Sequence, residues 1–179
     1  MMMRRHLRHL GANENGAAVI ELALVAPVLA LAIIGVADIS NAYTRKLALE
    51  QGAQRAIEKI MQTTGDSTVE GTVTTEAVCQ VNGMNADGTC KTSPISATDV
   101  TVTWRLECTD SGSAITSQTS SDSATFDAMV CGSGTVKEAR YLQVRVNDKY
   151  TPIFPVHFAG FISTDGTYHL SATAGMRTE

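Results

Sequence analysis

The sequence has little charge and no excess of basic residues. Asp, Glu, Lys and Arg make up 18% of its 179 residues, whereas about 25% is typical of soluble proteins. The net charge is −4, and a general nucleic-acid binder would carry a basic footprint instead. We therefore expect no nucleic-acid partner. The composition also excludes a collagen, a chain that is disordered throughout and a polytopic membrane protein.

Catalytic motifs are absent as well. The chain has no G-x-S-x-G nucleophile elbow, no H-E-x-x-H metal motif and no phosphate-binding glycine loop. His157 and His169 flank Asp165, a combination that suits proton transfer, but His157 lies among apolar residues, which favours a packing role. We expect no enzyme, no catalytic residue and no cofactor.

One apolar run lies near the N-terminus. Residues 17–37 read AAVIELALVAPVLALAIIGVA, and their only charge is Glu21. About 20 apolar residues cross the hydrocarbon core of a bilayer, so this run predicts a transmembrane segment. A cleavable signal peptide has a shorter apolar region of about 7–15 residues. That alternative would place the cut after Gly35-Val36-Ala37 and release the chain from the membrane.

The residues before the run are basic. Arg4, Arg5 and Arg8 stand against one acidic residue, Glu14, in residues 1–16. Excess basic residues beside a single span keep that side of the membrane cytoplasmic. We therefore expect the chain beyond the span to be exported.

All four cysteines follow the span, which agrees with export because disulfides persist outside the cytoplasm. Four cysteines allow three pairings. We favour Cys79–Cys90, because Asp87-Gly88 between them is a hairpin-turn signal, and Cys108–Cys131. The spacings are unlike the short Cys-x-x-Cys pairs of structural zinc, so we expect no metal site.

The helical pattern continues beyond the span. Residues 38–63 are rich in good helix formers and contain no proline, which predicts a single helix over residues 17–63 with a kink at Pro27. Lys46 and Glu50 are spaced to pair across one turn. A broad apolar face is predicted from Ile39, Ala42, Tyr43, Leu49, Ala53, Ile57 and Ile60.

From residue 66 the period changes to that of strands. Residues 100–108 and 142–146 alternate apolar and polar side chains, and weaker strand candidates lie at 68–81 and 168–174. Residues 109–134, dense in Ser, Thr and Gly, predict a long loop. We expect an α+β fold, in which a small antiparallel, disulfide-bonded sheet accompanies the long N-terminal helix. The predicted organisation is a leader at 1–16, a span at 17–37, a helix continuation at 38–64 and an exported head at 65–179.

An ionisable residue inside a span costs about 2.5–3.5 kcal/mol on insertion scales and is read as functional by default. The alternative is that Glu21 is simply hydrated near the cytoplasmic edge. Cleavage after Gly16 would remove the basic leader and make Glu21 the fifth residue, one turn from the new amino group of Ala17. A carboxylate there would neutralise that amine on an adjacent subunit packed in register.

A basic leader that ends in Gly, a small residue after the cut and Glu at the fifth position resemble the type IV prepilin pattern. Within that group, GAAVIELALVAPVLALAIIGVADISNAY resembles the TadE/TadF-like minor pilins of the tight-adherence (Tad/Flp) pilus. The segments YLQVRVNDKYTPIFP and LSATAGMRTE resemble them too. The resemblance is strongest over residues 16–61, weaker over 141–179 and absent between.

The resemblance implies cleavage by a prepilin peptidase between Gly16 and Ala17, with methylation of the new amine left open. It also implies assembly beside the major Flp pilin and other minor pilins at an inner-membrane platform. Leu22 stands where major Flp pilins carry Tyr, so we expect a priming, tip or regulatory subunit. The chain would be a single-pass inner-membrane protein with a cytoplasmic N-terminus and a periplasmic or extracellular head. The alternative is an anchored envelope domain that binds a ligand or partner without polymerising.

Overall fold

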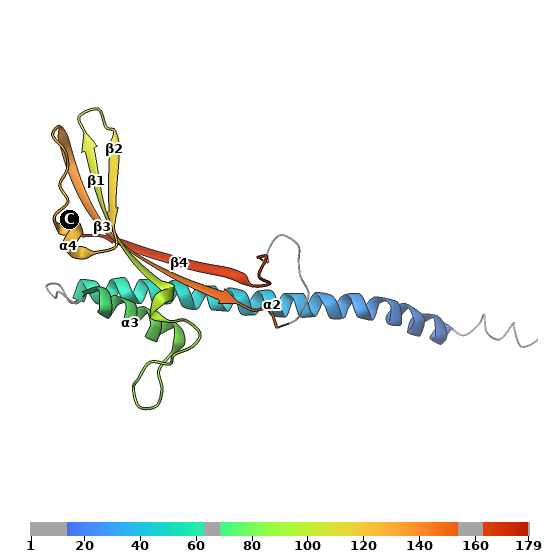
Figure 1. The fold of residues 1–179 in the computed structure, drawn as a ribbon. Helices are drawn as coiled ribbons and strands as arrows, with labels where there is room; N and C mark the ends of the chain where they lie inside the picture. Colours follow the sequence, from blue (N-terminus) through green and yellow to red (C-terminus); the bar gives the residue numbers. More distant parts are fainter. Residues whose placement is uncertain (1–13, 63–68, 154–162, 179) are drawn as a thin grey trace, which may run out of the picture. The chain divides into compact units, whose positions relative to one another are not determined.

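The fold is that of a computed structural model, which describes residues 14–62, 69–153 and 163–178 (Figure 1). The described residues fall into two compact units. The first holds the N-terminal part of a long helix, as far as Asn41, together with Ile153. The second holds the rest of that helix, from Ala42, and the other described helices and strands. The sheet and its core therefore belong to the second unit.

The long helix, α2, runs over Glu14–Gln62 without a break. This confirms the continuous helix that the composition of residues 17–63 predicts. Pro27 lies inside it, and a proline there leaves one carbonyl of the preceding turn without its backbone donor. The kink expected at Pro27 stays a prediction.

The described strands form a four-stranded antiparallel sheet in the order β2-β1-β3-β4 (Figure 1). A short turn of 3-10 helix, η1 (Ala97–Asp99), leads into β1 (Val100–Asp110), which pairs with β2 (Ile115–Ser120) and with β3 (Thr135–Tyr150). The edge strand β4 (Tyr168–Arg177) pairs with β3. The α+β fold and the strands expected at 100–108, 142–146 and 168–174 are thereby confirmed.

The core lies between one face of this sheet and two helices, α2 and α3 (Val69–Asn82). The register stacks Val102 beside Val144, and Val144 beside Ala174, so that alternate residues of three strands point the same way. Burying these side chains is the main favourable term in the stability of the head. The buried residues are Leu49, Ala53, Ala56, Ile57 and Ile60 of α2, Val73, Ala77 and Val81 of α3, Ile95, and Val102, Leu142, Val144, Val146 and Ala172 of the sheet.

On α2, the apolar side chains that are buried in this core start later than the predicted apolar face. Leu49 and Ala53 are fully buried, but Ile39 and Tyr43 are 57% and 62% exposed. The prediction is therefore wrong for the first turns after the span, because the core cluster contacts α2 only from Leu49 onward.

Helices α2 and α3 approach each other closely at Gly52. A Cβ atom placed on Gly52 would lie 2.5 Å from Cγ2 of Val81 and 3.1 Å from the carbonyl oxygen of Ala77. Atoms do not approach that closely, so the missing side chain of Gly52 sets the distance between the two helices.

The expectation of a strand at residues 68–81 is wrong, because the segment forms α3. Its Val and Thr residues favour strands in isolation. However, Val73, Ala77 and Val81 recur every four residues, which places them on one helix face. Packing of that face against α2 outweighs the local preference.

The long loop expected over residues 109–134 is also wrong. This segment contains β2 and a short helix, α4 (Ser123–Asp127). Asp122 caps α4 by accepting a hydrogen bond from the Thr125 amide (2.7 Å). Phe126 is buried and stacks on Trp104, with the ring centres 5.3 Å apart. A second small core therefore orders the segment.

Disulfides join the cysteines in the favoured pairs, Cys79–Cys90 and Cys108–Cys131. The first closes the turn that Asp87-Gly88 indicates, and Gly88 adopts a positive φ of 82° there. The second ties β1 to the chain that follows α4, beside the Phe126 cluster. The predicted pairing therefore agrees with the structure.

A buried amide fixes the loop that follows α3. The side chain of Asn82, which is 8% exposed, accepts a hydrogen bond from the Ile95 amide (3.0 Å). It donates to the carbonyl oxygens of Lys91 (2.8 Å) and Ile95 (2.7 Å). All hydrogen-bonding atoms of this side chain are therefore used to hold residues 91–95 against the end of α3.

Candidate functional site

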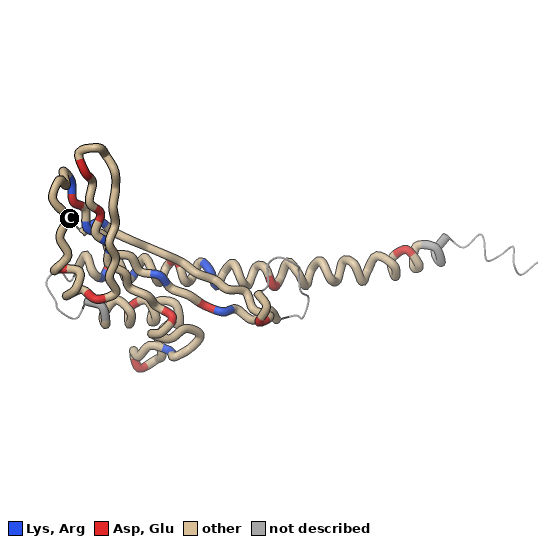
Figure 2. Tube along the Cα trace, turned by 45° about the horizontal axis from the view of Figure 1, so that its top comes forward, with Lys and Arg blue, Asp and Glu red and all other residues tan. Residues whose placement is uncertain are grey.

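The first half of α2 presents an apolar surface that the described chain leaves uncovered. Ten of its large hydrophobic side chains between Val19 and Val36 are 46% to 74% exposed, and Ile34 is half-buried. Among the described residues, α2 is the one helix whose length and composition would let it cross a membrane, with a mean hydropathy of 2.6 over its most apolar 18 residues. Figure 2 shows the long uncharged part of this helix. A surface of this kind needs lipid or other helices around it.

The predicted cleavage and assembly residues lie on this helix. The helical backbone begins at Glu14 and passes through Gly16, Ala17, Glu21 and Pro27. The Glu21 side chain is exposed, and no described residue pairs with it. It lies four residues after Ala17, about 6 Å further along the axis. The carboxylate is therefore open to a group outside the described chain.

A buried carboxylate marks the end of the apolar run. Asp38, which is 4% exposed, accepts a hydrogen bond from the backbone amide of Ile153 (2.9 Å). This contact holds the chain that follows β3 against the helix, one residue beyond the predicted span. The acid directly after the apolar run was visible in the sequence, but nothing there indicated its partner 115 residues away.

A second polar contact joins α2 to the end of β3. Nε of Arg45 lies 2.6 Å from Oδ2 of Asp148, whose side chain is 7% exposed. The predicted pair of Lys46 and Glu50 is also present, at 3.9 Å, but it is open to water and contributes little. The Arg45–Asp148 pair joins residues that are distant in the sequence, so no periodicity predicted it.

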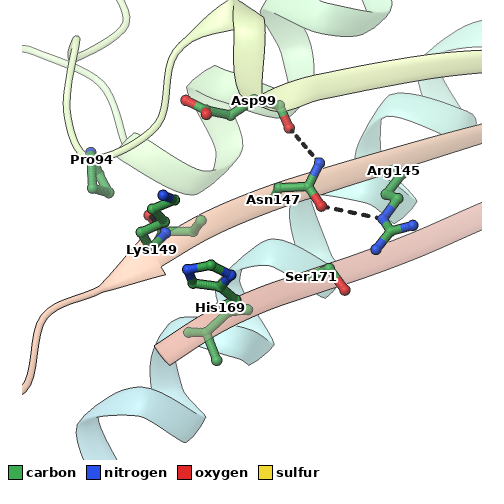
Figure 3. Close-up of a pocket in the computed structure, with 9 residues that line it drawn as sticks. Pro94, Asp99, Arg145, Asn147, Lys149, His169 and Ser171 are labelled. Carbon is green, nitrogen blue, oxygen red and sulfur yellow. Dashed lines mark hydrogen bonds between the residues drawn. The ribbon is translucent and has the colours of Figure 1, made fainter. Parts of the chain in front are cut away.

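The sheet has a polar face opposite the core. The register places alternate residues of β1, β3 and β4 in rows on this face, including Arg105, Tyr141 and Arg177. A hollow of about 540 Å³ lies over β3 and β4, with Arg145, Asn147, Lys149, His169 and Ser171 in its lining (Figure 3). Polar hollows of this size are large enough to hold a small ligand.

One acid lies close to the end of this face. Oδ2 of Asp165 is 2.9 Å from Nε2 of His169 and 3.2 Å from Nζ of Lys149. Hydrogen bonds with His169 and Thr167 hold the pKa of Asp165 well below its ordinary value, and the Lys149 contact acts in the same direction. The group is exposed, which suits a surface ion pair. His157, the other histidine considered for proton transfer, lies outside the described residues.

Within the described ranges, no three His, Cys, Asp or Glu side chains are grouped so that they would bind a metal. Arg105 pairs with Glu107 (3.1 Å), and its guanidinium lies over the Tyr141 ring, 5.0 Å from the ring centre. These are contacts of a charged, water-facing surface.

Residues 16–57 match the sequence model of the TadE-like protein family. The resemblance that the N-terminal pattern predicts is therefore confirmed over this segment, which indicates involvement in a Tad pilus system. The match ends before α3, so the weaker resemblance over residues 141–179 stays a prediction. No curated protein and no solved structure matches the chain.

Proposed function

We propose that the chain is a minor pilin of a Tad/Flp pilus, a structural subunit that primes, caps or regulates the fibre. The observation that carries the proposal is the apolar run at residues 17–37 of α2, most of whose large side chains are exposed and whose one charge is Glu21. The match of residues 16–57 to the TadE-like family supports it, because it covers this part of the helix.

A helix that is apolar on all sides is stable only in lipid or among other helices. A pilin uses one such helix in both settings, first as a membrane anchor and then as part of the fibre core. The exchange costs little, because lipid tails and leucine side chains are similarly apolar. The exposed side chains of residues 19–36 fit both settings.

In the proposed mechanism a prepilin peptidase cuts between Gly16 and Ala17. The cut removes the basic leader and leaves a positive amino group at the N-terminus of the helix. That charge is unfavourable both beside the helix dipole and in an apolar environment. Glu21 of one subunit pairs with the Ala17 amine of its neighbour, so that each neutralises the other.

Before assembly the chain is a single-pass inner-membrane protein with its basic end in the cytoplasm. Its disulfide-bonded sheet then lies in the periplasm or outside the cell. The partners in this proposal are the prepilin peptidase, the major Flp pilin, other minor pilins and the inner-membrane assembly platform.

The cleavage is tested on protein from its native host. We expect intact-mass analysis to give a chain that begins at Ala17, and we expect Gly16→Val to leave the leader attached. Glycine lets the backbone approach an enzyme closely, and a branched side chain prevents that approach. Gly132→Val is the control, because a Cβ there meets no atom within 4 Å.

Two results would contradict the proposal. A wild-type chain that still begins near Met1, or normal processing of Gly16→Val, would favour an anchored domain that does not polymerise. A new terminus near Asp38 would instead identify a secreted protein with a signal peptide.

A further inference from the structure

The polar face of the sheet differs in charge from the rest of the chain. The chain has 14 Lys and Arg against 18 Asp and Glu. On this face, however, the strand positions that pair in register as far as Thr109 hold five cationic residues and a single acid, Glu107. Arg105 pairs with Glu107, and Lys149 pairs with Asp165 beyond the strands. The cations are Arg105, Lys137, Arg145, Lys149 and Arg177, and all five side chains are exposed. This face is therefore suited to an anionic ligand.

Arg145 is held in place without being neutralised. Its Nε donates to Oδ1 of Asn147 (3.2 Å), and Nδ2 of Asn147 donates to the carbonyl oxygen of Asp99 (3.4 Å), as Figure 3 shows. No described carboxylate lies within 4.0 Å of its guanidinium. The amide of Asn147 thus orients the guanidinium and leaves its charge uncompensated.

The remaining donors of Arg145 have the geometry that a carboxylate needs. With Nε bonded to Asn147, the two terminal nitrogens stay available, and such a pair binds the two oxygens of a carboxylate side by side. The hollow beside them carries further polar groups, among them Lys149, His169 and the Ser171 hydroxyl, and the acids Asp99 and Asp148 line it too. Asp148 is neutralised by Arg45, and Asp165 bonds to both Lys149 and His169. Amines and hydroxyls of this kind bind the hydroxyl groups of sugars.

A second, smaller hollow of about 210 Å³ lies on the same sheet, lined by residues that include Arg105, Tyr141, Gln143 and Arg177. Gly175 also lines it, and a Cβ there would stand 3.2 Å from the carbonyl oxygen of Leu142. Arg145 of the first hollow and Tyr141 of the second are four residues apart on β3, which corresponds to about 13 Å along the strand. A linear polymer with repeated acidic groups can reach both.

Two other classes of anionic partner fit less well. The centre of a protein–protein interface is usually apolar, whereas the exposed residues along β4 on this face are His169, Ser171, Thr173, Gly175 and Arg177. Single-stranded nucleic acid needs open aromatic rings on which its bases stack, and Arg105 already covers the Tyr141 ring.

We propose that this sheet face binds an acidic polysaccharide, with a uronate carboxylate held by Arg145 and a second acidic group of the same polymer at the hollow over Gly175. The proposal goes beyond the role in a pilus and stands whether or not the chain enters a fibre.

The test uses the full-length chain in micelles of an uncharged detergent, titrated with polygalacturonate in a calorimeter. We expect binding that weakens as salt is added. Arg145→Gln should reduce the affinity by about tenfold to a hundredfold, because hydrogen bonds to a charged group are lost. Arg145→Lys keeps the charge but not the paired donors and should give an intermediate loss.

Lys91→Gln makes the same change of charge on an exposed loop residue outside both hollows, and it should leave the affinity unchanged. The melting temperature of each variant shows that the head is still folded. Absence of binding by wild type, or equal losses in Arg145→Gln and Lys91→Gln, would overturn the proposal.

Three further polymers test the ligand class. Neutral dextran should not bind, since it offers no carboxylate. Polyglutamate and single-stranded DNA should bind more weakly than polygalacturonate at the same salt concentration. If polyglutamate binds more tightly than polygalacturonate, the face recognises acidic protein and the assignment to a polysaccharide is wrong. Tighter binding of single-stranded DNA than of polygalacturonate would overturn the assignment in the same way.

Discussion

At the scale of single residues, buried polar groups hold the loops of the head, and surface ion pairs add little. The Lys46–Glu50 pair could be predicted from its spacing on a helix, but an exposed pair of this kind contributes at most about 1 kcal/mol. Asn82 and Asp38 lie 13 and 115 residues from the backbone amides that they bind. The sequence contains no signal for such contacts, because the approach of the two segments is a result of the whole fold.

Asn82→Ala should lower the free energy of unfolding by about 2–3 kcal/mol. The substitution leaves the Ile95 amide and two carbonyl groups without their partner at a buried position, where an unsatisfied group is costly. Urea denaturation of the full chain in detergent measures the change.

Asn85→Ala is the matched control for Asn82. The Asn85 side chain donates to the Thr89 hydroxyl in an exposed turn (2.9 Å), so water replaces the lost contact and the change should stay within about 0.5 kcal/mol. Equal effects of the two substitutions would show that the buried amide does not hold the loop.

At the scale of elements, the sequence predicted the helices and strands whose own apolar periodicity determines their structure. Helix α2, β1 and β3 have a clear period of helix or strand, and all are present. The segment that forms α3 reads as a strand because its Val and Thr residues have that local preference, but its contact with α2 makes it a helix. In the same way β2 and α4 depend on partners, since Phe126 is ordered by Trp104.

Gly52→Ala should destabilise the head by about 1–2 kcal/mol. Alanine normally stabilises a helix relative to glycine by up to about 1 kcal/mol, but here the methyl group would collide with Val81 and approach the Ala77 carbonyl. Overpacking of this kind costs about 1–3 kcal/mol. Thermal unfolding followed by circular dichroism measures the sum of the two effects.

The control for this contact is Gly71→Ala on α3, where the added methyl group meets no atom within 4 Å. That variant should be as stable as the wild type or more stable. If Gly52→Ala is equally well tolerated, the two helices do not approach each other as closely at Gly52 as described.

At the scale of the whole molecule, the chain combines two kinds of surface. Residues 17–37 of α2 are apolar and uncharged apart from Glu21, while most of the charged residues lie after them, mainly on the head. The sequence predicted this division, because composition alone separates the apolar run from the polar head. It did not predict how charge is distributed within the head, since the cationic face arises only when β1, β3 and β4 pair in register.

Glu21→Gln should reduce incorporation of the chain into sheared pili at least about tenfold, because it removes the proposed negative partner of the Ala17 amine. Cleavage after Gly16 should continue, since the Glu21 side chain lies one turn beyond the cut. Quantitative immunoblots of the pilus and membrane fractions measure the ratio.

Glu50→Gln provides the comparison for Glu21, as it removes the same charge from an exposed position further along α2 and should leave incorporation unchanged. Normal incorporation of Glu21→Gln would show that assembly does not require the Glu21 carboxylate, and would favour an anchored domain that does not polymerise.

The order of the strands also governs when the head can fold. The face of α2 at residues 49–60 is covered in part by β3 and β4, and Ala172 of β4 belongs to the same core. More than a hundred residues separate that face from β4 along the chain. In the proposed orientation the head emerges gradually from the membrane, so this face of the helix stays open until β4 has crossed. Under that proposal the head folds after its translocation, and a chain delayed during export is the form most exposed to aggregation.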